Sequence, residues 1–159
     1  MPLLPAVRFA ATLCLMAGAA AFSQPGPGDR PLSQHHHRAM KIHITIDVRV
    51  IPATLADTAA SRDFAAMLPL DLMLTDHAAT EKIGDLPKRL RTQGAPAGHE
   101  PRPGDIAYYA PWGNLALFHA PFRYSEGLVR LGSIDSGIDI LKKGGRLRAR
   151  IELVPVAAH

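Results

Sequence analysis

The sequence predicts a mainly β protein, a small antiparallel barrel that is closed or nearly closed and carries two short helices. Several short segments alternate apolar and polar residues, which is the pattern of strands that bury one face. Turns rich in Gly and Pro separate these segments at short intervals. At 159 residues, the chain is long enough for one domain around a single core.

Residues 40–55 predict a hairpin of two strands, the first over 40–48 and the second over 50–55. Pro52 indicates that the second strand lies at a sheet edge, because proline cannot donate a ladder hydrogen bond. The expected buried sides are Ile42, Ile44, Ile46 and Val48 in the first strand and Ile51, Ala53 and Leu55 in the second.

A short helix and a third strand are expected next. Asp57 or Thr58 can cap the helix, and Pro69 ends it. Residues 76–104 are polar and punctuated by Pro and Gly, so we expect a long connection that wraps one end of the barrel. The apolar side of the helix would consist of Ala60, Phe64, Met67 and Leu68, and that of the strand of Leu70, Leu72 and Leu74.

The clearest hairpin joins residues 106–110 to residues 115–120. Its loop would be residues 111–114, in which Gly113 can supply the positive φ that tight loops require. With this loop, Tyr109 opposes Ala116 and Ala107 opposes Phe118. One face of the hairpin then carries two rings among alanines, which predicts a shallow depression.

The C-terminal part predicts a strand, a second short helix and a last strand. The first of these strands covers residues 127–132, and the helix, capped by Ser133 or Asp135, ends at Gly144 and Gly145. The last strand covers residues 146–154. The expected inward residues are Ile134, Ile138 and Leu141 in the helix and Leu147, Ala149, Ile151 and Leu153 in the strand.

Residues 1–23 have the pattern of a cleavable signal peptide, with one charge at Arg8, an apolar run over residues 9–16 and small residues up to Ala21. The run is shorter than the roughly 20 residues that span a bilayer. We therefore expect a periplasmic or secreted domain over residues 40–155, free of the membrane after cleavage. Residues 24–39 would form a flexible tether. A start at Met40 would instead leave the protein in the cytoplasm.

The residue types exclude several kinds of chemistry. The single cysteine, Cys14, lies in the leader, so the mature chain has no disulfide and no thiolate ligand. A net charge of +4 without a Lys/Arg cluster gives no indication of nucleic acid binding. The histidines at 35–37 lie in the tether without a partner cage, and no zinc signature is present, so we expect neither a metal nor another cofactor. No nucleophile elbow or phosphate loop indicates a hydrolase or a nucleotide enzyme.

The aromatic residues favour a binding groove. Six of the nine aromatic side chains lie between Tyr108 and Tyr124. Adjacent residues of one strand point to opposite faces, so only one of Tyr108 and Tyr109 faces the interior. Packing in the core is the alternative explanation for these rings. The groove would take a peptide or a small ligand, and its expected residues are Tyr109, Trp112 and Phe118, with Glu81 and Arg62 at its edge.

One long motif resembles a known family. It runs Gly104-Asp-Ile-Ala-Tyr-Tyr-Ala-Pro-Trp-Gly-Asn-Leu-Ala-Leu-Phe118, with Thr80-Glu-Lys-Ile83 and Asp85-Leu-Pro87 upstream and Gly127-Leu-Val129 and Leu131-Gly132 downstream. This pattern resembles a bacterial family of cyclophilin-like domains of uncharacterised function, over residues 40–153. The resemblance implies a cyclophilin-like β-barrel. The family usually carries Tyr where this chain has His77 and His119.

The resemblance does not assign an activity. Cyclophilins that isomerise prolyl bonds use an arginine in a Phe-His-Arg-x-x-Pro stretch and a Gln-Gly-Gly-Asp stretch, and this chain has neither. The leading hypothesis is therefore an exported ligand-binding domain with no assignable catalytic residue. The alternative is a periplasmic peptidyl-prolyl cis-trans isomerase of weak activity, in which Arg62 or Arg130 would donate to the prolyl nitrogen.

Overall fold

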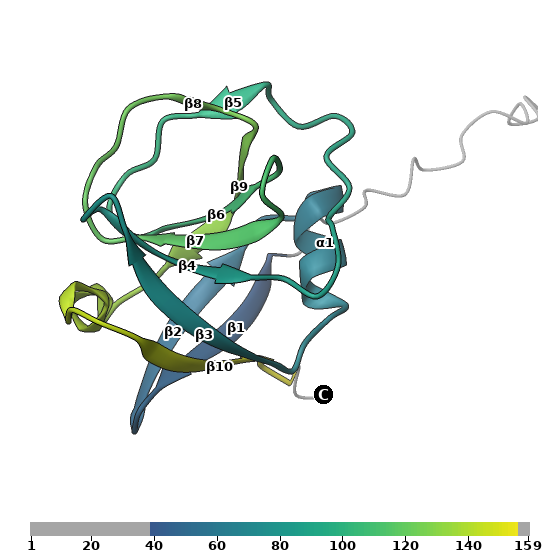
Figure 1. Cartoon of the computed structure of the whole chain (residues 1–159). Coiled ribbons are helices and arrows are strands. Elements are labelled where there is room, and N and C mark those ends of the chain that lie inside the picture. Colours follow the sequence, from purple (N-terminus) through teal and green to yellow (C-terminus); the bar gives the residue numbers. More distant parts are fainter. Residues whose placement is uncertain (1–38, 156–159) are drawn as a thin grey trace, which may run out of the picture. The chain divides into compact units, whose positions relative to one another are not determined.

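The computed structural model describes residues 39–155, and the leader, residues 35–37 and most of the expected tether lie outside them (Figure 1). Eight strands form the barrel: β1 (Met40–Ile46), β2 (Arg49–Leu55), β3 (Leu70–His77), β4 (Glu81–Asp85), β6 (Asp105–Tyr109), β7 (Asn114–Phe118), β9 (Leu128–Ile134) and β10 (Leu147–Leu153). Strands β5 (Gly98–His99) and β8 (Ser125–Glu126) form a separate two-stranded sheet, and the helices are α1 (Ala59–Ala65) and the 3₁₀ helix η1 (Ile138–Lys142).

The barrel is closed and antiparallel, with the strand order β1-β10-β3-β4-β7-β6-β9-β2. This confirms the predicted mainly β fold. Inward apolar residues of every barrel strand except β4 meet in one core, and Phe64 of α1 packs into the same core. The predicted alternation is confirmed for β1, where Ile42, Ile44 and Ile46 are buried.

Two residues at strand ends do not follow the predicted pattern. Val48 lies in the turn between β1 and β2 and is almost fully exposed. Leu153 is also exposed, because its pair with Ile42 is the last one between β10 and β1. A strict alternation therefore overestimates the buried set where the ladder stops.

Strand β2 is not the edge strand that Pro52 indicated, because it pairs with β1 on one side and β9 on the other. Its ladder with β9 begins at Ala53, immediately after the proline. The carbonyl of Pro52 accepts the backbone N–H of Asp135 at 2.9 Å. The missing proline N–H is therefore accommodated at the start of a ladder in a closed barrel.

Only one of the two predicted helices is an α-helix. The Thr58 hydroxyl caps α1 by accepting the backbone N–H of Ser61 at 3.1 Å. The second predicted helix is wrong in type and start, because Ser133 and Ile134 extend β9 and pair with β2. The segment between β9 and Gly144 forms a five-residue 3₁₀ helix, Ile138–Lys142, instead of an α-helix.

The expected long connection over residues 76–104 is also wrong, because it contains the barrel strand β4. This strand fills the position between β3 and β7. Its residue Lys82 is fully buried, pairs with Asp76 Oδ1 at 2.5 Å and donates to the carbonyl of Gly145 at 2.8 Å. A polar sequence can therefore form a barrel strand here because its buried ammonium has partners.

The hairpin of β6 and β7 has a different register from the predicted one. Tyr109 pairs with Asn114 and Ala107 with Ala116, so the loop is residues 110–113. Gly113 has φ of 78°, as expected. Because the register differs by two residues, each side chain stays on its predicted face.

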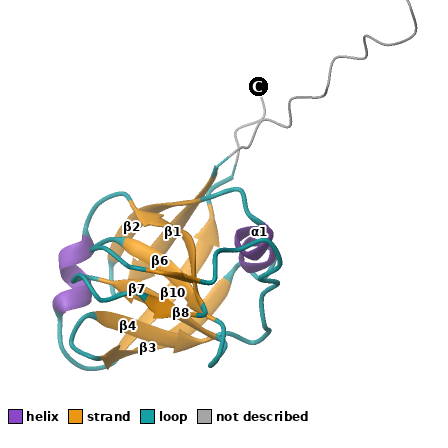
Figure 2. Cartoon of the chain, turned by 90° about the horizontal axis from the view of Figure 1, so that it is seen from above, coloured by secondary structure: helices purple, strands orange, loops and turns teal. Residues whose placement is uncertain are grey.

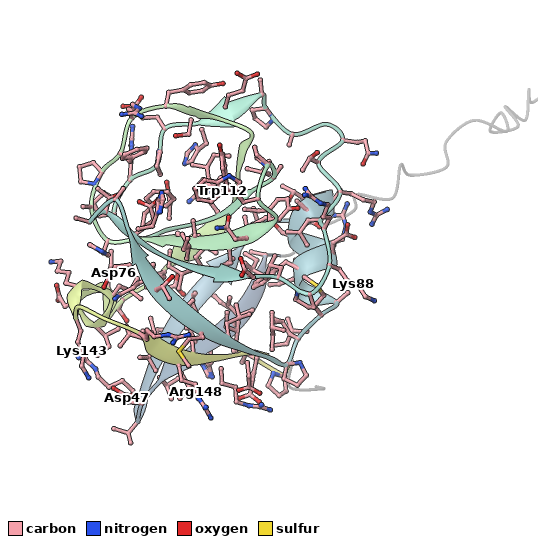
Figure 3. All side chains as sticks on the ribbon, in the orientation of Figure 1. Asp47, Asp76, Lys88, Trp112, Lys143 and Arg148 are labelled. Atoms are coloured by element: carbon pink, nitrogen blue, oxygen red, sulfur yellow. The ribbon has the colours of Figure 1, made fainter. Side chains whose placement is uncertain are left out.

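A second, smaller apolar cluster lies outside the barrel core. It consists of Ala107, Ala116, Phe118 and Leu128, with Ile83, Tyr109 and Phe122 packed against it. Apart from Phe122, which follows β7, these residues belong to the outward face of β4, β7, β6 and β9. The β5–β8 sheet lies over the same side of the barrel (Figures 1 and 2). Trp112 lies between the barrel and this sheet, whereas Asp47, Lys143 and Arg148 lie toward the other end (Figure 3).

Candidate functional site

A pocket lies on the outward face of the β4–β7–β6 part of the barrel. Alternate residues of each strand build it, since Glu81 and Ile83 line it while the intervening Lys82 does not. In the same way Asn114 and Ala116 of β7 line the pocket. The pocket has a volume of ≈ 210 Å³, which equals the liquid volume of about seven water molecules.

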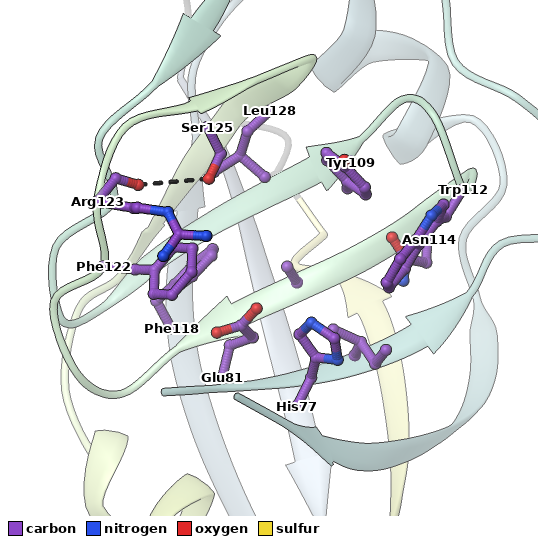
Figure 4. Close-up of a pocket in the computed structure, with 12 residues that line it drawn as sticks. His77, Glu81, Tyr109, Trp112, Asn114, Phe118, Phe122, Arg123, Ser125 and Leu128 are labelled. Atoms are coloured by element: carbon purple, nitrogen blue, oxygen red, sulfur yellow. Dashed lines mark hydrogen bonds between the residues drawn. The ribbon is translucent and has the colours of Figure 1, made fainter. Parts of the chain in front are cut away.

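Three rings form one end of the pocket (Figure 4). The rings of Trp112 and Tyr109 meet edge to face with centroids 5.3 Å apart, and His77 contacts Trp112 in the same manner at 5.4 Å. Trp112 nevertheless remains 59% exposed. A large rigid ring is thus held over the pocket without being buried.

The other end of the pocket carries Phe122 and Arg123, which follow β7 (Figure 4). The Arg123 guanidinium lies over the Phe122 ring at 5.0 Å, a favourable cation–π distance. Ser125 donates to the carbonyl of Arg123 at 3.3 Å. Both ends of the pocket are therefore aromatic, and the small side chain of Ala116 leaves space between them.

Two buried polar side chains face this space. Glu81 is only 6% exposed, and its carboxylate accepts a hydrogen bond from the Thr80 hydroxyl. Asn114 is 2% exposed, and its Oδ1 has no hydrogen-bond partner among the described residues. An unsatisfied buried acceptor is rare in native proteins and needs a reason.

Of the groove residues predicted from the sequence, four line this pocket and one does not. Tyr109, Trp112, Phe118 and Glu81 come together. Arg62 lies on α1, pairs with Asp57 and lines a separate cavity of ≈ 390 Å³.

The cavity beside α1 is larger and rich in arginine, but its arginines are already paired. Arg91 forms a bidentate contact with Asp63, with N···O distances of 2.6–3.1 Å, and this holds the pKa of Asp63 at about 2. Arg130, the other expected donor to a prolyl nitrogen, pairs with Asp105 at 2.9 Å. Neither Arg62 nor Arg130 lines the aromatic pocket.

Sequence reasoning missed several residues that line the pocket. His77 ends β3 and gave no signal beyond its place in the family pattern. Asn114 was assigned to a loop, although alternation from Phe118 through Ala116 places it on the same face. Arg123 lies in a segment with no predicted element, and only the fold brings it to the same pocket as Glu81.

Asp105 sits at the base of β6, beside this site, in a charged cluster. Burial alone would raise its pKa, but hydrogen bonds from Arg130, the backbone N–H of Arg102 and His99 outweigh burial and lower the pKa. Asp105 Oδ2 lies 2.8 Å from His99 Nε2. The cluster therefore joins β5, β6 and β9.

Residues 39–155 contain no group of His, Cys, Asp and Glu side chains that could hold a metal ion. Within the same range, no helix has the length and apolar character needed to cross a membrane.

Comparisons with known proteins place this barrel in a family. The family described as "Cyclophilin-like family" matches residues 44–152. This chain belongs to the cyclophilin-like family. A comparable barrel is the solution structure of the hypothetical protein AF2241 from Archaeoglobus fulgidus, with a TM-score of 0.56 at 16% identity. That match covers 76% of the present cyclophilin-like chain and 99% of the other, and at this identity it shows the fold alone. A search of curated proteins gave no match.

Proposed function

We propose that this cyclophilin-like chain is an exported binding domain that holds a small ligand, or one side chain of a peptide, in the pocket of Figure 4. The observation that carries the proposal is Trp112, a ring that stays exposed while Tyr109 and His77 fix it over an apolar recess. The barrel has its own core on the other side of the wall. The main core therefore does not need the rings of the outer cluster, in which Phe118 is buried whereas Trp112 stays exposed.

The composition of the pocket supports a binding role. Ligand sites are mostly apolar and carry a few polar groups that fix orientation, and here Glu81 and Asn114 are those groups. The volume of ≈ 210 Å³ is below the range of about 300–1,000 Å³ that suits drug-sized ligands. It suits a small metabolite or a single side chain.

Export is part of the proposal and rests on the leader pattern of residues 1–23. N-terminal sequencing of the native protein tests it, with processing expected between Ala21 and Gln24. A mature chain that begins at Met1 or Met40 in the cytoplasm would refute export and leave the binding proposal in place.

A prolyl isomerase is the second candidate, and Arg123 is the observation that favours it. Isomerisation of a prolyl bond requires a barrier of about 18–20 kcal/mol to be lowered, and a donor to the prolyl nitrogen beside an apolar pocket would help. Arg123 is a donor at the rim of such a pocket. A peptide assay with wild type and Arg123→Ala tests this role, and equal rates for both proteins would exclude it.

The binding role is tested by calorimetry with a library of small polar fragments and proline-containing peptides. We expect at least one binder, with affinity lowered by about tenfold or more in Trp112→Ala, since buried-interface tryptophans are frequent hot spots. Tyr124→Ala is the matched control, because Tyr124 is equally exposed and does not line the pocket. Equal losses in both variants, or no binder at all, would refute the proposal.

A further inference from the structure

The unpartnered oxygen of Asn114 indicates which chemical group a ligand presents at this end of the pocket. Its Oδ1 is buried, faces the pocket and accepts no hydrogen bond from the described residues. Such an atom loses its hydration on folding without compensation, unless a water molecule in the pocket or a ligand returns the bond. A carbonyl oxygen only accepts, so the ligand must present an N–H or O–H group at this end.

Glu81 is a second buried acceptor that requires a hydrogen-bond donor from the ligand. Its carboxylate is buried, its one hydrogen-bond donor in the described range is the neutral Thr80 hydroxyl, and it forms no ion pair there. Arg123 lies at the same end but remains exposed over Phe122. A buried carboxylate is stabilised best by a positive charge that also donates hydrogen bonds.

The two acceptors are too far apart for one small head group. Glu81 pairs with Phe118, whereas Asn114 pairs with Asp85 at the other end of the β4–β7 ladder. At about 3.4 Å per residue, the four-residue offset puts their backbones about 14 Å apart along the strands. Between the acceptors lie the apolar side chains of Ile83 and Ala116.

Resting on the proposed binding function, we propose that the ligand is a small aliphatic amine with a donor group at each end, of which a linear diamine is the simplest form. One ammonium donates to Glu81. The other donates to Asn114 Oδ1 and lies near Trp112 and Tyr109, whose rings favour a cation. The alkyl chain packs on Ile83 and Ala116.

Titration calorimetry with linear diamines, from diaminoethane to diaminohexane, tests this ligand class. We expect one length to bind best, and the monoamine of equal length to bind about tenfold or more weakly, because it loses one charged hydrogen bond. The matched diol should not bind. Diamines that bind no better than their diols would overturn the inference.

Variants locate the two contacts. Glu81→Gln should weaken diamine binding by about ten- to a hundredfold, whereas Glu100→Gln, an exposed control outside the pocket, should not. Asn114→Leu should weaken binding without lowering the midpoint of urea unfolding, since it removes an unpaired buried oxygen. Full diamine affinity in Glu81→Gln or Asn114→Leu would contradict the inference.

Two further arms separate the possible outcomes. The first arm uses Nα-acetyl-lysine methylamide, whose side-chain amine is free, to compare a lysine side chain of a peptide with a free diamine. Preferential binding of either compound supports an amine as the ligand. If other fragments bind in a Trp112-dependent way and no amine does, the inference fails and the binding function stands. If no probe binds wild type, both fail.

Discussion

Tyr108 and Tyr109 are neighbours in the chain and lie on opposite sides of the barrel wall. Tyr108 is buried in the main core, and its hydroxyl accepts the backbone N–H of Leu90 at 3.3 Å. Tyr109 lines the pocket and contacts Trp112. The period of two in a strand predicts this division from the sequence, but it does not say which tyrosine faces inward.

These two residues separate stability from binding. Tyr108→Ala should cost about 3–5 kcal/mol of unfolding free energy, as large aromatic truncations in cores do. Tyr109→Ala should cost about 1 kcal/mol or less and should weaken any ligand of the pocket. Urea unfolding and calorimetry on both variants provide the comparison. Equal destabilisation by the two substitutions, with unchanged binding, would show that the pocket rings are only core.

At the level of single residues, Arg62 shows where sequence reasoning stops. From the sequence we expect it at the edge of the groove, whereas the structure puts it on α1 beside Asp57. Asn114 and Arg123 reach the pocket from a strand end and a loop. Alternation from Phe118 places Asn114 on the pocket face, whereas the approach of Arg123 depends on how the segment between β7 and β8 folds, which no local pattern encodes.

Strand β4 shows why one whole element escaped prediction. Its pattern places Glu81 toward the outer pocket and Lys82 toward the interior, so both faces carry a charge in the sequence. Asp76 and the carbonyl of Gly145 satisfy the ammonium of Lys82, and both come from other segments. A rule that looks for alternating apolar residues cannot recognise a strand whose inward residue is charged and has its partners in distant segments of the chain.

The charged cluster at Asp105 joins three elements and makes their packing sensitive to acid. Because the pKa of Asp105 lies below its ordinary value of 3.8 in the folded protein, the ionised carboxylate stabilises the fold above that pH. This contribution is lost as the pH falls through the lowered pKa. The attachment of β5 to β6 and β9 should therefore weaken in acid.

Urea unfolding at neutral pH and at about pH 3 tests this element. Asp105→Asn should be less stable than wild type at neutral pH, and the difference between the two proteins should shrink at the lower pH. Asp85→Asn is the matched control, since Asp85 is exposed and has no side-chain partner among residues 39–155. A pH-independent difference for Asp105→Asn would contradict the account.

For the molecule as a whole, the alternation in short segments predicts a barrel-like β fold, but it does not predict how the barrel closes. The barrel strands other than β4 could be located from pattern and turns, and the family motif in residues 104–118 agrees with the family match over residues 44–152. Closure depends on β4, because this strand joins β3 to β7. The same strand supplies Glu81 to the pocket, whereas the pocket residues that the sequence did not predict, His77, Asn114 and Arg123, lie outside β4.

The central claim is that the outward pocket, and not the larger cavity beside α1, takes the ligand. Trp112 is the only tryptophan of the chain, so its indole N–H gives a single NMR signal for the pocket. During titration with linear diamines and with any fragment that binds, we predict shifts of this signal and of β4 and β7 amides, while α1 amides stay unchanged. Shifts confined to α1 and the arginine-lined cavity, with the Trp112 signal unmoved, would contradict the account.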